Sequence, residues 1–434
     1  MIRTRLWSAA LAAAALSSIG QTTRAQEPPK PPNGTKAPAA AAPAPDADEP
    51  MTFRAARPAD EQTAAPAATR PTRPTTMEQL SEASMQEIHI GGTKARYTLN
   101  FFGDVSFSLG DPQEPSDAAP IGRFPSFSLG DQTFLLRGEL GKHLVATTEW
   151  AFEIGDEVHV DVERMLVRYQ SDIFYVEAGR SHTAFGYWNN AYHHGRWLQP
   201  TILRPRWVAF EDDDGILPVH LVGIDAGAKF KTTGGSLNLV ASLGNGRGAI
   251  VDDVRNAGDI QSGKAVHLSL EYVGLFVPDL RVGISGMYDR IKGQPAMVRP
   301  ALPDAPIDEL IGGIHIAYPS VPLLLIAEAY IVDHKHESQD WTTYGGFALI
   351  GYNFGPFTPY GQVERIVAAG GDDPFFVPDP TVPHVSWDTF GFILGLRADL
   401  SDWTAIKAEY RNTRAIDRND SVVQEGVLNW SWGF

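Results

Sequence analysis

Several residue types and patterns are missing from this 434-residue chain, and each absence narrows what the protein can be. There is no cysteine, so neither a disulfide nor a thiolate-bound metal can form. Beyond the N-terminal segment, no stretch approaches about 18 uninterrupted apolar residues, which excludes a membrane-spanning helix. Basic residues are fewer than acidic ones, 36 against 52, and the formal charge of −16 argues against a nucleic-acid partner.

Motifs for catalysis and for cofactors are also missing. No G-x-S-x-G motif occurs, and Ser181 and His182 are sequence neighbours, an arrangement that seldom makes a nucleophile–base pair. The glycine-rich segment 244–248 ends a predicted strand and does not open a helix, so it does not predict a phosphate cradle. His193 and His194 are adjacent and would point apart in an extended chain. We therefore predict no enzymatic activity, no cofactor and no metal site.

The N-terminus is predicted to be a secretory signal peptide over residues 1–25. Arg3 and Arg5 precede a short apolar run from Leu6 to Ile19, and a small-x-small site predicts cleavage after Ala25. Loss of Arg3, Arg5 and Arg24 takes the formal charge from −16 to −19. Export without a spanning helix leaves the periplasm, the medium or a membrane barrel.

Residues 26–90 are predicted to be a disordered periplasmic leader. The part from 26 to 76 holds 12 prolines and 14 alanines, and Phe53 is its only aromatic residue, so it cannot bury a core. One or two helical turns could form between Met77 and Glu87. The leader is either a bland spacer or a tether to peptidoglycan or a periplasmic partner.

The C-terminal segment alternates perfectly between two kinds of residue. Leu428, Trp430, Trp432 and Phe434 fall on one face, and the intervening residues, Asn429 and Ser431 among them, fall on the other. Because side chains alternate across a strand, one face can meet lipid while the other meets water. An aromatic C-terminus on such a strand is typical of an outer-membrane barrel.

Sixteen strand-like runs of similar length follow one another through residues 91–434, the predicted barrel domain. In each of the clearest runs, hydrophobic residues alternate with polar ones, as in Val266 to Tyr272. The runs are 97–109, 131–141, 143–154, 159–169, 173–180, 220–231, 235–245, 264–273, 279–290, 309–318, 322–332, 342–354, 357–367, 387–399, 402–413 and 424–434.

The connections between these runs alternate in length. Short turns are predicted at 141–142, 170–172, 232–234, 274–278, 319–321, 355–356 and 400–401. Long loops are predicted at 110–130, 181–219, 246–263, 291–308, 333–341, 368–386 and 414–423, with one short exception near Gly155. Short turns at one end and long loops at the other predict an all-β, sixteen-stranded antiparallel transmembrane β-barrel.

The longest loop, 181–219, is unlike a flexible outer loop. It holds seven aromatic residues, Phe185, Tyr187, Trp188, Tyr192, Trp197, Trp207 and Phe210. This aromatic area is enough to pack against a wall. The loop also holds Arg196, Arg204, Arg206 and the acidic run from Glu211 to Asp214.

Short motifs in this loop resemble the phosphate-selective porin O and P type of outer-membrane porin. The motifs are Gly179-Arg180, Phe185-Gly186-Tyr187-Trp188-Asn189, Tyr192-His193-His194-Gly195 and Gly215-Ile216-Leu217-Pro218. The resemblance implies a sixteen-stranded, usually trimeric, passive porin whose third outer loop folds inward. Asp212 to Asp214 depart from the arginine- and lysine-lined route of the selective members, and their basic residues cannot be aligned onto this chain.

A pore constriction is predicted where loop 181–219 faces the wall. We expect Asp212, Asp213 and Asp214 to face the lumenal residues Arg137, Arg164 and Arg168, with Arg180, Arg196, Arg204, Arg206 and Glu211 close by. Opposed charges across a narrow passage create a transverse field that favours dipolar solutes. Alternatively, the acids cap a helix of the loop or pair locally with Arg204 and Arg206.

The predicted function is passive diffusion of small hydrophilic solutes or ions through the barrel. One alternative is a phosphate- or polyphosphate-selective anion channel in which Arg196, Arg204 and Arg206 line the passage. Another is a structural outer-membrane barrel tethered to the cell wall by its leader. The expected partners are outer-membrane lipid and lipopolysaccharide, two further copies in a homotrimer, and small solutes or anions, and the expected location is a Gram-negative-type outer membrane.

Overall fold

The chain forms a closed antiparallel barrel in which each long strand pairs with the next one in sequence. In this computed structural model sixteen strands, β2 and β4 to β18, complete the circle because β18 also pairs with β2. Two short strands, β1 and β3, add to the wall through their pairing with β2. The predicted sixteen-stranded barrel is therefore confirmed.

The strands and short helices have the following bounds: β1 Gln86–Ile90, β2 Thr93–Gly110, β3 Ser126–Leu129, β4 Gln132–Leu140, β5 Leu144–Ile154, β6 Val158–Gln170, β7 Phe174–His182, α3 Trp188–Ala191, η1 Arg206–Val208, β8 His220–Thr232, β9 Gly235–Gly244, β10 Ala265–Val273, β11 Arg281–Ile291, β12 Ile307–Tyr318, β13 Leu323–Lys335, β14 Asp340–Tyr352, β15 Phe357–Ala369, β16 Thr389–Ser401, β17 Thr404–Ala415 and β18 Val422–Gly433. Among the described residues, no helix is long and apolar enough to cross a membrane.

The structure describes residues 79–80, 84–90, 92–110, 125–154, 158–192, 195–211, 215–248, 263–292, 305–369, 373, 375–376, 388–416 and 422–434. All of them belong to one compact unit, residues 69–434. The predicted signal peptide and the leader up to residue 78 lie outside the described residues.

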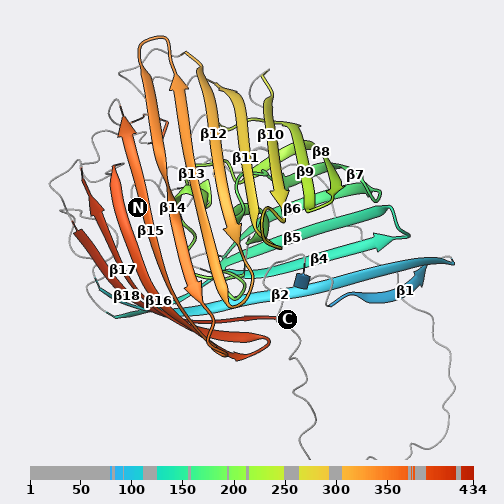
Figure 1. Ribbon diagram of the computed structural model, residues 1–434, viewed down its shortest axis with the longest axis horizontal. Helices are drawn as coiled ribbons and strands as arrows, with labels where there is room; N and C mark the ends of the chain where they lie inside the picture. Colours follow the sequence, from blue (N-terminus) through green and yellow to red (C-terminus); the bar gives the residue numbers. More distant parts are fainter. Residues whose placement is uncertain are drawn as a thin grey trace, which may run out of the picture. The chain divides into compact units, whose positions relative to one another are not determined.

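The two ends of the barrel sequence meet along one seam. Figure 1 shows β2 beside β18, and the register pairs Trp430 with Val105 and Gly426 with Leu109. At the end of the seam, the amide of Phe101 donates to the carbonyl of Phe434 at 2.7 Å, and the amide of Phe434 donates back at 3.0 Å. The C-terminal phenylalanine thus closes the last pair of hydrogen bonds, so the seam has no unpaired edge there.

Three segments differ from the sequence-based prediction. Residues 126–129, predicted as part of the long loop 110–130, form β3 and pair with β2. Residues 86–90, placed at the end of the leader, form β1 and pair with the first residues of β2. Residues 333–341, predicted as a long loop, contain only a four-residue turn, 336–339, because Lys335 still pairs with Asp340. The polar residues Asp333 and His334 hid this extension: the Asp333 side chain accepts a hydrogen bond from Thr342, and His334 is fully buried.

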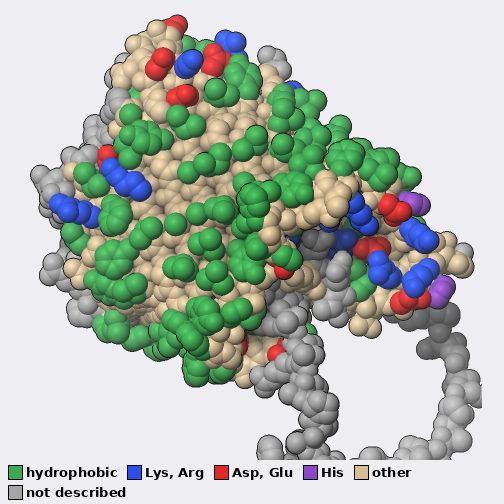
Figure 2. All heavy atoms as spheres, in the orientation of Figure 1, with side chains coloured by type: hydrophobic (Ala, Val, Ile, Leu, Met, Phe, Trp, Pro, Cys, Tyr) green, Lys and Arg blue, Asp and Glu red, His purple; other side chains and the backbone are tan. Residues whose placement is uncertain are grey.

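The wall has an apolar outer face and a polar inner face. Leu99, Leu268 and Leu394 are exposed on the outside, whereas the alternate residues Asn100 and His267 are completely buried. On the face shown in Figure 2, hydrophobic side chains cover the middle of the wall and charged side chains gather toward its edges. A charge on a lipid-facing midplane would cost about 2–4 kcal/mol, which accounts for this distribution.

The adjacent charges Glu364 and Arg365 on β15 cannot both face inward, because neighbouring side chains of a strand point to opposite faces. Glu364 faces inward, where it accepts a hydrogen bond from the backbone amide of Arg206 at 2.9 Å. Arg365 takes the opposite parity and forms an ion pair with Asp388, just before β16. Both charges therefore have partners, and the outward one lies near the end of the wall where long loops connect the strands.

Candidate functional site

The segment between β7 and β8, residues 183–219, folds into the barrel and packs on its inner wall. Trp188 meets Phe347 of β14 edge-on at 5.9 Å between ring centroids, and Trp207 stacks on Tyr330 of β13 at 5.6 Å. Trp188, Trp197 and Trp207 are all fully buried. The loop thus has its own hydrophobic contact with the wall, as its aromatic content predicted.

Carboxylates of the wall hold the backbone amides of this loop. Glu328 of β13 accepts hydrogen bonds from the amides of Tyr187 and Trp188 at 2.8 and 2.7 Å. Glu409 of β17 accepts one from the amide of Ile202 at 2.7 Å. Hydrogen bonds from amides to an ionised acceptor are among the stronger ones in proteins, so these contacts fix the path of the chain.

Cations of the wall hold the backbone carbonyls of the same loop. The ammonium of Lys407 on β17 donates to the carbonyls of Gln199 and Thr201 at 2.7 and 2.8 Å and also to that of Arg196. Arg397 of β16 donates to the carbonyl of Gln199 at 3.1 Å. Lys407 is 0 % exposed, so these contacts satisfy a charge that has no access to water.

A glycine permits the closest approach of the loop to the wall. Gly186 has a φ of +60°, and a β-carbon there would lie 2.2 Å from Oε2 of Glu328 and from the Tyr330 hydroxyl. The conformation and the space both require glycine. The Phe-Gly-Tyr-Trp sequence therefore fits the turn that brings the Tyr187 and Trp188 amides onto Glu328.

Two of the predicted constriction arginines in the loop have structural partners. Arg204 donates to the carbonyls of Val208 and Tyr192 at 2.6 and 3.0 Å and to the side chain of Asn189 at 3.0 Å. Arg196 lies 2.8 Å from Asp104 of β2 in an ion pair. Arg204 in particular uses its whole planar fork to hold the loop together.

The other three predicted residues near the loop also lie in contacts. Arg180 donates to the carbonyl of Glu163 at 3.2 Å, and Arg206 uses its backbone amide to bind Glu364. Glu211 accepts a hydrogen bond from the amide of Val219 at 2.7 Å. Burial raises the pKa of Glu211, but the contact with His220, a backbone hydrogen bond and the charge of Arg247 together outweigh burial, so the net pKa is lowered.

The wall arginines predicted to face the loop form a ladder with glutamates. Arg164 lies 2.6 Å from Glu149, Arg168 lies 2.6 Å from Glu177, and Arg137 lies 3.0 Å from Glu139. The arginine side chains remain partly exposed, at 19–29 %, whereas the three glutamates are nearly buried. We call these six residues of β4–β7 the arginine–glutamate ladder.

The acids predicted to face this ladder, Asp212, Asp213 and Asp214, lie outside the described residues, as do His193 and His194. Strand alternation puts Glu328, Arg397, Lys407 and Glu409 on the inward face, but it does not predict their role in holding the loop. Parity shows which face a side chain takes. It carries no signal for which backbone atoms of a distant loop will meet that side chain.

A second buried cluster lies near the long-loop end of the barrel. His334 of β13 bridges two carboxylates, with Asp373 at 2.6 Å from Nδ1 and Glu309 at 2.9 Å from Nε2. Nε of Arg247 lies 3.2 Å from Glu309, and Phe375 and Phe376 both contact the ring of His334. The described part of the loop between β15 and β16 is therefore also attached to the inner wall.

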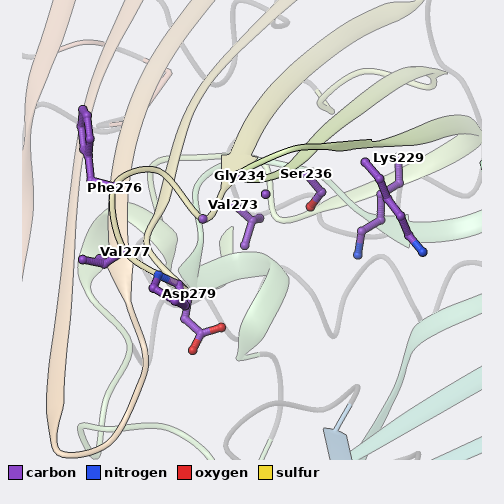
Figure 3. Close-up of a pocket in the computed structure, with 11 residues that line it drawn as sticks. Lys229, Gly234, Ser236, Val273, Phe276, Val277 and Asp279 are labelled. Carbon is purple, nitrogen blue, oxygen red and sulfur yellow. The ribbon is translucent and has the colours of Figure 1, made fainter.

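The short-turn end of the barrel carries exposed charge. Figure 3 shows a concave surface beside the turn between β10 and β11, with Lys229, Ser236 and Asp279 among its lining residues. Lys229 and Lys231 are exposed and share the inward parity of Asp225 on β8. Farther in, Glu271 contacts Arg281 at 3.2 Å and His315 at 3.3 Å.

Comparison with known proteins finds matches among solved structures only. No family model and no curated protein matches the chain. An anion-selective porin from Comamonas acidovorans has a TM-score of 0.53 and 13% identity, with 78% of this chain and 100% of that chain covered. OmpF of Salmonella typhi, solved with daunomycin, has a TM-score of 0.51 and 12% identity over 80% of this chain and 100% of that chain. Outer-membrane expressed OmpT of Vibrio cholerae has a TM-score of 0.51 and 11% identity over the same shares. The chain therefore has the fold of outer-membrane porin barrels.

Proposed function

We propose that this protein is a passive channel of the outer membrane that lets small hydrophilic solutes or ions diffuse through its barrel. The observation that carries the proposal is the pairing of an apolar exterior with a charged interior, the partly exposed arginine–glutamate ladder. An apolar outer face is stable in lipid, and a charged inner face is stable where hydrogen-bonding partners or water meet its charges. The ladder arginines keep part of their surface exposed, as side chains beside a water-filled passage would. No energy coupling or catalytic step is part of this proposal.

The proposed route runs between the inward loop and the ladder. The loop is held by residues of β13–β17, so it leans on that side of the barrel, and the ladder lies on β4–β7. We propose that Asp212, Asp213 and Asp214 face Arg137, Arg164 and Arg168 across this route. Charge reversal at Asp213 tests that part: a changed reversal potential in a salt gradient supports it, and unchanged conductance and selectivity overturn it.

The proposal as a whole is tested by reconstitution of the mature protein in planar bilayers. We expect stepwise, ohmic conductance in potassium chloride that does not depend on a voltage threshold or on an energy source. Absence of any conductance, together with loss of cell-wall binding when residues 26–76 are deleted, would favour a structural, tethered barrel instead.

Selectivity for phosphate is a second candidate, supported by the exposed Lys229 and Lys231 and by the motif resemblance. The loop arginines give it less support, because Arg196 pairs with Asp104 and Arg204 is engaged by three acceptors within the loop. A preference for anions over cations combined with block of chloride current by phosphate would establish this function.

We further propose a homotrimer in contact with lipid and lipopolysaccharide, which cross-linking in the membrane tests.

A further inference from the structure

A short segment before β1 contacts the inner face of the barrel. The hydroxyl of Ser84 lies 2.6 Å from that of Thr98, and the side-chain amide of Asn100 donates to the Ser84 hydroxyl at 3.0 Å. Thr98 and Asn100 share the parity of Asp104 on β2, which pairs with Arg196 of the inward loop. Leu99, of opposite parity, is 59 % exposed on the outside. Ser84 therefore lies inside the barrel.

Leu80 lies next to Ser84, also on the inner side of the barrel wall. The amide and the hydroxyl of Ser84 both donate to the carbonyl of Leu80, at 3.1 and 2.9 Å, so the two residues are in direct contact. The Leu80 side chain is completely buried and belongs to the same hydrophobic cluster as Phe102 of β2 and Leu135 of β4. Both of these residues face inward, since a β-carbon on Gly195 of the loop would lie 2.7 Å from the ring of Phe102 and Leu135 pairs with Asn100.

The burial of the wall agrees with an occupied interior at this point. Thr98 and Asn100 are 0 % exposed, although they line the inside of a barrel. Arg96, the next inward residue toward the short-turn end, has a side chain that is 47 % exposed. The inner wall is thus exposed at Arg96, near the rim, and covered at Thr98 and Asn100, where Leu80 and Ser84 lie.

We propose that Leu80 and Ser84 act as an internal plug, which occupies the barrel interior near its short-turn end and restricts passage along β2 and β4. This inference rests on the proposed channel function. The plug is separate from loop 183–219: it precedes the first strand, whereas the loop follows β7. Its described contacts include one buried leucine and two side-chain contacts of Ser84.

Two deletions that differ by eight residues test the plug. Removal of 26–76 leaves Leu80 and Ser84 in place, whereas removal of 26–84 takes both away and retains β1. We expect the first variant to conduct like the full mature chain and the second to show a higher single-channel conductance. Equal conductance of the two variants would overturn the plug, while no conductance from any form would count against the channel function itself.

A cross-link tests the seating without reliance on conductance. Because the chain has no cysteine, the pair Ser84→Cys and Thr98→Cys gives the protein its only two thiols. We expect oxidation of the folded protein in membranes to join them within one chain, and the control pair Ser84→Cys and Leu99→Cys to stay reduced, since Leu99 points outward. Failure of the first pair to cross-link in a folded barrel would contradict the proposal.

Point variants complete the test. Leu80→Glu should raise conductance toward that of the longer deletion, because a carboxylate cannot remain in the buried apolar site without a partner. Gln86→Ala, at an exposed position of β1, should leave conductance unchanged. Equal effects of the two substitutions would indicate that Leu80 has no special place in the barrel.

Discussion

Two parts of the inner wall use the same charged side chains for different purposes. On β13–β17, Glu328, Lys407 and Glu409 are buried, and each binds backbone atoms of loop 183–219. On β4–β7, the arginines of the ladder pair with glutamates and keep part of their surface exposed. An inward-facing charge therefore does not by itself mark a residue that lines the passage. Its role depends on whether it contacts loop backbone or water.

The difference has an energetic origin. A buried charge must have its hydrogen-bonding capacity filled, and removal of one partner leaves the others unsatisfied at about 1–3 kcal/mol per group. A partly exposed ion pair is screened by water and contributes about 0–1 kcal/mol. Substitutions on β13–β17 should thus act on stability, and substitutions in the ladder should act on the ions that pass.

The lysines give the largest expected contrast. Lys407→Met takes a donor away from three loop carbonyls, of which that of Gln199 keeps its hydrogen bond from Arg397, and we expect a loss on the order of 2 kcal/mol or more in the free energy of unfolding. Lys229→Met, at an exposed inward position, should leave stability unchanged. Urea unfolding of the two variants in detergent, followed by tryptophan fluorescence, measures the difference, and similar midpoints for both would remove the distinction between the two parts.

The glutamates extend the comparison to channel behaviour. Glu328→Gln weakens the hold on the amides of Tyr187 and Trp188, and we expect a loss of about 1–2 kcal/mol in stability and noisier open-channel current. Glu177→Gln releases Arg168 from its partner and should raise anion preference without loss of stability. Paired recordings and unfolding curves would contradict this account if Glu177→Gln were the more destabilising change.

The arginines separate selectivity from structure. Replacement of Arg164 and Arg168 by glutamine removes two positive charges from the inner face and keeps Glu149 and Glu177, so the reversal potential in a potassium chloride gradient should move toward that of potassium. Arg204→Lys, a loop substitution that keeps the charge but loses the planar fork, should cost about 1 kcal/mol and leave the reversal potential unchanged. A shift from Arg204→Lys as large as that from the ladder pair would show that Arg204 faces the ions.

The smallest expected effect concerns pH. Because the folded pKa of Glu211 is lowered, its ionised form contributes stability above its unfolded pKa of about 4.3, and that contribution is lost as the pH falls through the lower folded value. Glu211→Gln should therefore flatten the acid limb of the stability curve. An unchanged acid limb in thermal unfolding between neutral and acidic pH would show that Glu211 is not anchored as described.

The sequence was most informative where a simple period fixed the structure. Alternation such as that from Val266 to Tyr272 reports which face meets lipid, and the spacing of turns reports the closed up-and-down topology. The aromatic content of loop 183–219 predicted its inward position. All of these follow from a local requirement: along one strand or loop, apolar side chains must avoid water and backbone groups must form hydrogen bonds.

The rest depends on contacts between distant segments. Nothing near Lys407 in sequence indicates that it will meet the carbonyls of Gln199 and Thr201, more than 200 residues away. Leu80 and Ser84 follow a segment rich in proline and alanine, and their polar and apolar neighbours gave no sign that they enter the barrel. Residues 333–341, where β13 turns into β14, predict a loop because they are largely polar. They lie at the rim of the barrel, where a strand does not need an apolar outer face.

The most direct test of the central claim uses two adjacent threonines of β5. Thr147 has the inward parity of Glu149, and Thr148 has the outward parity of its partner Leu136. In the cysteine-free chain, a charged, water-soluble thiol reagent applied during bilayer recording should lower the conductance of Thr147→Cys and leave that of Thr148→Cys unchanged. A fall in conductance for Thr148→Cys alone, or an equal fall for both variants, would contradict a barrel with a water-filled interior and a lipid-facing exterior.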